Sequence, residues 1–354
     1  MVLMLLLATM LLVGACGSSD ATSPGSGKKV TIDVGGGKII TVTGPPKVAF
    51  FTFGSNNAYM SVINPSMKRA IEAIPGAEFT MFDPAFDPQK QLNQLQNALA
   101  SRRYNAWIVD AVDGSLICNI VTKEAPAANI AVVQVAGPAC GLEKEPSSQD
   151  HWAPGTVAIV DNLSTNFLVD WYEYVVKKNP GPQKVIVVTG PDTHPTFLQH
   201  KNALAEIQAK YPDFKVVAIA PTDFSRLKGQ QVTQSLLLAH PDATLLMGIY
   251  SDITEGALTA IAQAGKTGQI KVYDRGGSAP IIEAIKAGTV AATTANYPID
   301  AANAATDALR RAFAGEEGPR VILNDGGPVP AGSETGMTPI DSSNVADFHV
   351  EYGG

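Results

Sequence analysis

The segment from residue 218 to residue 275 constrains the fold most, because it alternates strand-like and helix-like patterns. Its strand-like runs KVVAIA, ATLLMGIY and IKVY are each followed by polar residues, among them Asp223, Asp252 and Asp274. Strands that alternate with helices pair in parallel through right-handed crossovers, and ligands of open α/β sheets bind beyond the carboxyl ends of the strands. The segment therefore predicts a parallel sheet with a ligand site at its strand ends.

The same alternation runs through the rest of the chain. The runs KVAFFTFG, AEFTMFD, AWIVDAVDGS, IAVVQVAG and KVIVVTG are separated by helical stretches with apolar residues on one face. With 354 residues, 45% of them hydrophobic, the chain is long enough for two compact lobes. Before these units, KVTIDV and KIITVT alternate around three glycines and predict a β-hairpin.

A family resemblance covers about fifty residues in the second half of the chain. The runs PTDFSRLKGQQVTQSLLLAHPDA, SDITEGALTAIAQAGK and VYDR resemble, in order and spacing, the second lobe of the ribose-type, type I periplasmic sugar-binding proteins. The resemblance implies an α/β fold of two Rossmann-like, doubly wound lobes with parallel sheets, joined by a three-segment hinge. It implies an N-terminal lobe over 47–160, a C-terminal lobe over 161–296, a return to the first lobe over 297–337, and a return to the second over 338–354.

The N-terminal residues have the pattern of an export signal. Residues 1–15, MVLMLLLATMLLVGA, are too short to cross a hydrocarbon core of about 30 Å comfortably. The sequence VGAC resembles a bacterial lipobox, which implies a diacylated Cys16 followed, up to residue 46, by a polar tether and the hairpin. No Lys or Arg precedes the apolar run, although export signals normally begin with positive charge, which leaves the position of the start codon open.

Two cysteines remain, Cys118 and Cys140. In an exported protein they can form a disulfide, which would close a loop of about twenty residues and contribute about 3 kcal/mol in the chain-entropy model. The alternative is two buried thiols in adjacent βα units. The sequence leaves both open.

The resemblance implies ligand-binding positions residue by residue. Asn57 and Tyr59 match the family's asparagine and aromatic residue after the first strand, and Phe224 matches an aromatic residue after "PTD". Tyr59 and Phe224 are therefore expected to sandwich the apolar faces of a sugar ring. Ser251 stands where the family often has asparagine, and Asp252 lies beside it.

Further positions complete the expected site. Asp274 matches the aspartate that ends the next strand, Asn296 matches an amide at the second crossing between lobes, and Asp113 follows the strand AWIVDAV. The family's Asp-Arg pair after the fourth strand is replaced by Ala136 and Gly137, and a second family arginine aligns roughly with His200. Loss of both arginines makes ribose doubtful as the ligand, and Arg275 is a candidate to replace one of them. Asp192, Thr193 and His194 are further candidates in the facing loop.

Composition and motifs weigh against other classes of protein. A net charge of -7 without a basic run argues against nucleic acid as a partner. The five histidines are scattered, so we expect no metal, and no cofactor motif is present. The sequence AGKT at 264–267 lacks the glycine that a P-loop requires and ends a helix instead. Asp110, Asp113, Asp252 and Asp274 permit a paired-carboxylate glycosidase, but such residues more often cap helices or bind hydroxyls.

These observations predict a non-enzymatic, monomeric receptor, exported and either lipid-anchored to the outer face of the cytoplasmic membrane or periplasmic. Its ligand is expected to be a sugar or sugar-like polar molecule, and its partner the permease of an ABC importer, reached by hinge closure. Two alternatives stay open: a ligand sensor for a membrane kinase, and a receptor for a nucleoside or polyol. The effector domain of a lactose-type repressor shares the fold, but it needs a helix-turn-helix where this chain has a signal.

Overall fold

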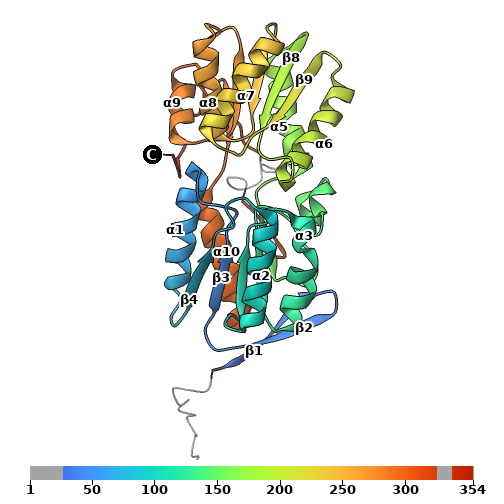
Figure 1. The fold of residues 1–354 in the computed structure, drawn as a ribbon, viewed down its shortest axis with the longest axis vertical. Helices are drawn as coiled ribbons and strands as arrows, with labels where there is room; N and C mark the ends of the chain where they lie inside the picture. Colours follow the sequence, from blue (N-terminus) through green and yellow to red (C-terminus); the bar gives the residue numbers. More distant parts are fainter. Residues whose placement is uncertain (1–26, 325–336, 354) are drawn as a thin grey trace, which may run out of the picture.

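Two mostly parallel sheets organise the protein, in a computed structural model that describes residues 27–324 and 337–353. Figure 1 shows them stacked along the long axis, each covered by helices. We call the lobe that contains β3 lobe 1 and the lobe that contains β8 lobe 2. The expected signal peptide, Cys16, most of the tether and residues 325–336 lie outside the described residues.

Lobe 1 has the strand order β13-β7-β6-β5-β3-β4. Its strands are β3 (Lys47–Phe51), β4 (Glu78–Phe82), β5 (Ala106–Val109), β6 (Ala131–Val135), β7 (Ala158–Asp161) and β13 (Val321–Leu323). Its helices are α1 (Ala58–Glu72), α2 (Pro88–Ser101), α3 (Gly114–Asn119), a π-helical turn (Ile120–Glu124), α4 (Ala125–Ala127) and α10 (Pro298–Ala314). Two short 3-10 turns, Leu142–Lys144 and Ser148–Asp150, lie in the loop between β6 and β7.

Lobe 2 has the strand order β14-β12-β11-β10-β8-β9, in which only β14 is antiparallel to its neighbour. Its strands are β8 (Gln183–Thr189), β9 (Phe214–Pro221), β10 (Leu245–Gly248), β11 (Lys271–Gly276), β12 (Ala292–Ala295) and β14 (Ile340–Asp341). Its helices are α5 (Thr165–Lys178), α6 (Pro195–Lys210), α7 (Arg226–Ala239), α8 (Ser251–Gln263) and α9 (Ala279–Lys286).

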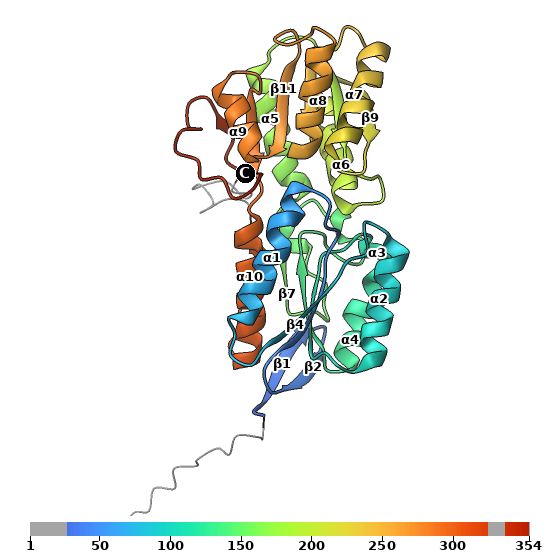
Figure 2. The ribbon, with the colours of Figure 1, turned by 60° about the vertical axis from the view of Figure 1, so that its left-hand side comes forward.

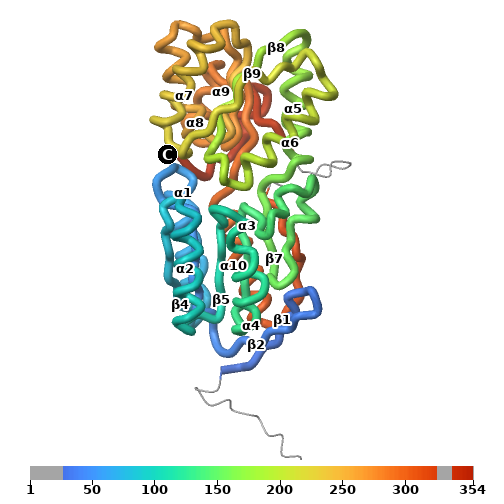
Figure 3. Tube along the Cα trace, turned by 45° about the vertical axis from the view of Figure 1, so that its right-hand side comes forward, coloured from blue at the N-terminus to red at the C-terminus, as the bar shows by residue number. Residues whose placement is uncertain are grey.

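The chain passes between the two sheets three times. It leaves lobe 1 after β7, returns after β12, and crosses again between β13 and β14. The returning helix α10 packs beside α1, as Figure 2 shows. The tube in Figure 3 follows the first two of these passages between the lobes. The predicted fold class is confirmed: two parallel α/β lobes share a three-segment hinge.

Local sequence explains where the elements begin. Strand β3 is buried over four of its five residues, as expected for a central strand of a parallel sheet covered on both faces. Helix α1 starts after Asn57, whose side-chain oxygen accepts a hydrogen bond from the Met60 N–H at 2.8 Å. Because strands run toward the other lobe and helices run back, helix N-termini and strand ends gather where the lobes meet.

Residues 29–43 form the antiparallel hairpin that their alternation predicts. Strand β1 (Lys29–Gly35) pairs with β2 (Lys38–Thr43), and Val34 and Ile40 pack into the core of lobe 1. A side chain at Gly35 would overlap the ring of Trp152, since a Cβ there lies 2.2 Å from it. In Figure 1 the hairpin lies at the end of lobe 1 that is far from lobe 2.

A disulfide joins Cys118 in α3 to Cys140 in the loop after β6. The bridge that the sequence left open is therefore present, and it ties that loop to α3. Among the described residues, no helix is long and apolar enough to span a membrane. The same residues contain no cluster of three or more His, Cys, Asp or Glu side chains placed to hold a metal ion.

Replacing both cysteines with serine should lower the free energy of unfolding by about 3 kcal/mol, because the bridge closes a loop whose ends are 22 residues apart. Urea unfolding of wild type and Cys118→Ser/Cys140→Ser protein measures the difference. Reductant should destabilise only the wild type. Two free thiols in the denatured, unreduced wild type would contradict the bridge.

Candidate functional site

A cavity of about 60 Å³ lies between the lobes, where the strand ends and helix N-termini of both meet. Its lining residues come from both lobes: Phe53, Asn57, Tyr59, Met60, Asp110, Ala136, Asn162, His194, Thr196, Phe224, Ile249, Tyr250, Arg275 and Asn296. Side chains of the two lobes therefore meet around the cavity. A ligand the size of a sugar enters only when the lobes move apart.

Strand ends position the polar residues of the cavity. Asp110 directly follows β5, Arg275 lies at the end of β11, and Asn296 directly follows β12. All three are at least 95% buried. The arrangement follows the rule that open parallel sheets bind ligands beyond the carboxyl ends of their strands.

Four polar groups at the cavity have unused hydrogen-bonding capacity. Tyr59 Oη, Arg275 Nε and Asn296 Oδ1 are buried and have no hydrogen-bond partner in the part of the chain that is described. The Asp110 carboxyl forms no hydrogen bond or ion pair with any described residue, and burial alone shifts its pKa. Buried polar atoms are normally paired, so each of these groups marks a place where a ligand atom fits.

Burial also sets the charges of the site. Desolvation raises the pKa of Asp110 to about 8, so its carboxyl is largely neutral at pH 7 in this closed state. Burial, and then the nearby Arg275 charge, lowers the pKa of His194 to about 3, which leaves the imidazole neutral. Arg275 donates from Nη2 to the backbone oxygen of Asn162 at 2.9 Å. The site thus presents one guanidinium among neutral groups.

Aromatic rings form the remaining walls. Phe53 in lobe 1 meets His194 and Phe224 in lobe 2 edge to face, with ring centroids 4.4 Å and 5.6 Å apart. Phe224 also meets Tyr250 at 5.3 Å. Phe224 has a left-handed backbone, with φ of 65°, and a Cβ at Gly190 would lie 2.1 Å from its ring. Such a backbone is unfavourable for a bulky residue and is often found at functional sites.

Five of the ten ligand-binding residues proposed from the sequence line this cavity. They are Asn57, Tyr59, Phe224, Arg275 and Asn296. Tyr250 contacts the rings of both Tyr59 and Phe224, at 6.4 Å and 5.3 Å. The five residues come from both lobes, so they meet only in the folded protein.

Asp113 and His200 do not line the cavity. Asp113 caps α3, accepting hydrogen bonds from the backbone N–H groups of Ser115 and Leu116 at 2.9 Å and 3.0 Å. His200 is buried in lobe 2, where Nδ1 lies 2.5 Å from the hydroxyl of Tyr172. A helix cap and a core contact occupy these two side chains.

Asp274, Ser251 and Asp252 also lie outside the lining. Asp274 is fully buried and accepts hydrogen bonds from Ser251, Thr254, Thr293 and the backbone of Gly277. Ser251 is thereby used within lobe 2. Asp252 accepts a hydrogen bond from the backbone N–H of Ala58 in lobe 1 at 3.1 Å. Protein groups thus supply the partners of both carboxylates.

Sequence reasoning missed several lining residues. Asp110 has the same sequence pattern as the proposed residues, a polar side chain directly after a buried strand. From the sequence, it is a candidate only as one carboxylate of a possible glycosidase pair. Phe53 and Tyr250 lie in the apolar runs KVAFFTFG and ATLLMGIY, whose pattern indicates strands and does not mark either ring as a ligand contact. Ala136, which the resemblance places at a family ligand position, also lines the cavity. The remaining missed residues carry no sequence signal of their own: Met60, Asn162, Thr196 and Ile249. His194, considered as a candidate in the facing loop, does line the cavity.

Comparison with curated proteins finds relatives that bind sugars. The ribose import binding protein RbsB of Escherichia coli is 26% identical over 246 residues, which span 69% of this chain and 76% of that protein. The galactofuranose-binding protein YtfQ of the same organism is 27% identical over 188 residues, 50% of this chain and 54% of that protein.

Solved structures share the fold. An ABC transporter solute binding protein of Mycobacterium smegmatis with bound glycerol matches with a TM-score of 0.72 at 22% identity, covering 88% of this chain and 100% of that one. One from Bacillus halodurans with bound myo-inositol matches with a TM-score of 0.73 at 18% identity, covering 87% and 98%.

A family model described as the periplasmic binding protein domain matches residues 48–317. This match spans both lobes and confirms the resemblance found in the sequence. The family consists of substrate-binding proteins that act outside the cytoplasm. This chain belongs to the periplasmic binding protein family.

Proposed function

We propose that this protein is the extracytoplasmic receptor of an ABC importer, which binds a sugar or a sugar-like polyol between its lobes and delivers it to the permease. The main support is the convergence of Tyr59, Asp110, Arg275 and Asn296, all with unused hydrogen-bonding groups, on one cavity with aromatic walls.

The chemistry of these groups suits a polyhydroxy ligand. Arg275 Nε can only donate and Asn296 Oδ1 can only accept, while a neutral Asp110 carboxyl and the Tyr59 hydroxyl do both. A hydroxyl group also donates and accepts, so vicinal hydroxyls satisfy such a mixed set. The rings of Phe53, Phe224 and Tyr250 can cover the C–H faces of the ligand.

The departures from the ribose-type pattern concern which sugar or polyol is bound. Ala136 lines the cavity where the resemblance expects the aspartate of an Asp-Arg pair. Asp110, from the neighbouring strand, and Arg275, from the other lobe, place a carboxyl and a guanidinium at the same cavity instead. We infer that the ligand differs from ribose in the position of its hydroxyl groups. Relatives solved with glycerol and myo-inositol support polyols as the second candidate class.

We also propose that the protein is lipid-anchored, monomeric and without catalytic activity. The lipid anchor rests on the lipobox-like sequence that ends at Cys16. A receptor releases its ligand unchanged, so mass spectrometry of ligand recovered after prolonged incubation tests the absence of turnover. A chemically altered ligand would contradict the receptor function.

A thermal-shift screen over sugars, polyols and nucleosides should identify a ligand, and calorimetry should then show weaker binding by Arg275→Ala and Asn296→Ala. We expect each variant to lose about tenfold or more in affinity, since a hydrogen bond to a charged group contributes about 1.5–3 kcal/mol and a neutral one about 1 kcal/mol. Arg310→Ala, which removes an exposed arginine of α10, is the matched control. Unchanged affinity in both site variants would contradict the assignment.

Asp110 should make stability depend on pH. Its raised pKa means that the folded protein holds a proton that the unfolded chain releases between about pH 4 and pH 8, so its contribution to the free energy of unfolding falls as pH rises through this window. Relative to wild type, Asp110→Asn should gain at least about 1 kcal/mol between pH 5 and pH 8. Urea unfolding at both pH values measures this, with Asp242→Asn at an exposed site as control. Parallel pH profiles would refute it.

Expression in a bacterium with lipoprotein-processing enzymes should place the wild type in the membrane fraction and Cys16→Ser in the soluble extracytoplasmic fraction. One acyl chain adds only marginal membrane affinity, whereas two acyl chains give a stable anchor. Intact-mass analysis should show a diacylglyceryl group on Cys16. An unmodified amine on Met1 in the native protein would exclude the anchor.

A further inference from the structure

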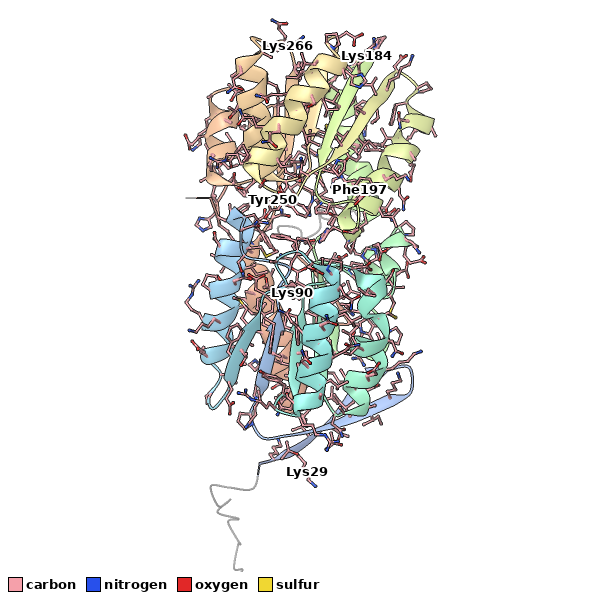
Figure 4. The ribbon with its side chains drawn as sticks, in the orientation of Figure 1. Lys29, Lys90, Lys184, Phe197, Tyr250 and Lys266 are labelled. Atoms are coloured by element: carbon pink, nitrogen blue, oxygen red, sulfur yellow. A yellow bond between two sulfur atoms is a disulfide. The ribbon has the colours of Figure 1, made fainter. Side chains whose placement is uncertain are left out.

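The lobes form direct hydrogen bonds beside the cavity, at the N-terminus of α1. The backbone N–H of Ala58 donates to Oδ2 of Asp252 at 3.1 Å, and the hydroxyl of Tyr250 donates to Oδ1 of Asn57 at 3.2 Å. Ala58 and Asn57 belong to lobe 1, whereas Tyr250 and Asp252 belong to lobe 2. Figure 4 shows Tyr250 where the two lobes meet. These bonds exist only while the lobes are closed.

Asp252 supplies what the start of α1 lacks. A helix begins with N–H groups that have no partner inside the helix, and its N-terminus carries a partial positive charge. The first turn of α1 contains no acidic residue, and the Asn57 side chain accepts from Met60, which leaves the Ala58 N–H to be satisfied from outside. The carboxylate of the opposite lobe fills this place.

The same carboxylate lies in the first turn of α8, which begins at Ser251. Two helix N-termini, α1 of lobe 1 and α8 of lobe 2, therefore both lie near Asp252. Their partial positive charges repel each other, and a negative charge between them offsets this repulsion. Asp252 provides that charge, and it is almost fully buried there without lining the cavity. Burial raises the pKa of Asp252, whereas the hydrogen bond from Ala58 and then the charge of Arg226 on α7 lower it and favour the carboxylate. Glu255, one turn further along α8, pairs with Arg226.

We propose that Asp252 is a latch residue that holds the lobes closed in the absence of ligand, by bridging the N-termini of α1 and α8. The inference rests on the proposed function, because a latch matters to a receptor that opens and closes. It gives Asp252 a role in setting the closed-to-open ratio rather than in binding the ligand. A larger closed fraction raises apparent affinity, since the ligand has less of the closing free energy to supply.

The bond can be cut from either side. Asp252→Ala removes the acceptor, and Ala58→Pro removes the donor, because proline has no backbone N–H. Proline is well tolerated at the first position of a helix, and the preceding Asn57 already has the extended backbone that a proline requires, with φ of -134° and ψ of 167°. The donor can thus be deleted while α1 keeps its start.

Small-angle scattering of the full chain without any ligand, fitted as a mixture of closed and open forms, tests the latch. We expect each single variant to lower the closed-to-open ratio about tenfold, which corresponds to about 1.4 kcal/mol. The double variant should fall no further than the single variants, because both remove the same bond. Asp87→Ala is the control: Asp87 caps α2 through the N–H of Lys90 within lobe 1, so its loss should leave the ratio unchanged.

Several results would overturn the latch. These are a wild type that is fully open without ligand, single variants with the wild-type ratio, or a double variant whose loss is the product of the single losses. Circular dichroism shows whether Ala58→Pro folds; if it does not, Asp252→Ala against Asp87→Ala decides alone. Because the scattering experiment uses no ligand, its result is independent of the binding screen. A confirmed latch in a protein that binds neither sugar nor polyol would refute the proposed function and keep the latch.

Discussion

Burial of the Arg275 guanidinium between the lobes is the constraint on which the site depends. In the closed form it has one hydrogen bond to a backbone oxygen and an unpartnered Nε, with no carboxylate in contact among the described residues. A buried charge costs free energy unless hydrogen bonds replace its hydration. A ligand that offers hydrogen-bond acceptors offsets this free-energy cost in the closed form. Opening of the lobes offsets it in another way, because water then hydrates the guanidinium. The same guanidinium thereby couples ligand binding to closure.

The supply of hydrogen-bond donors also distinguishes two aspartates near Arg275. Asp274, next to Arg275 in β11, receives four hydrogen bonds from lobe 2 and remains inside it. Asp110 has no such partners, so burial raises its pKa and leaves a neutral carboxyl facing the cavity. Burial raises the pKa of Asp274 as well, but its hydrogen-bond donors act in the opposite direction. The two aspartates at the ends of parallel strands thus differ in role because their surroundings supply different numbers of donors. One is a structural anchor, and the other is available to a ligand.

Polar side chains at strand ends and at the start of α8 have three different roles. Asp274 organises lobe 2, Asn296 and Arg275 face the cavity, and Asp252 reaches across to α1. The bond from α1 to Asp252 thus lies beside the cavity, and Asp252 is not one of its lining residues. The strength of the closed state can therefore change without alteration of the ligand contacts, which suits a receptor whose affinity depends on both.

The sequence by itself determined the two α/β lobes, the hairpin and the edge of the sheets at which a ligand binds, because hydrophobic periodicity and strand-end polarity are local properties. It did not determine which polar side chain at that edge faces the cavity. Adjacent side chains of a strand point to opposite faces, so Asp274 and Arg275 cannot share a direction, and the packing of α8 decides between them. The pairing of Asp252 with α1, 194 positions away in the chain, likewise exists only through the closed arrangement of the lobes. Tertiary structure decided these points because each depends on which groups the opposite lobe brings within hydrogen-bonding distance.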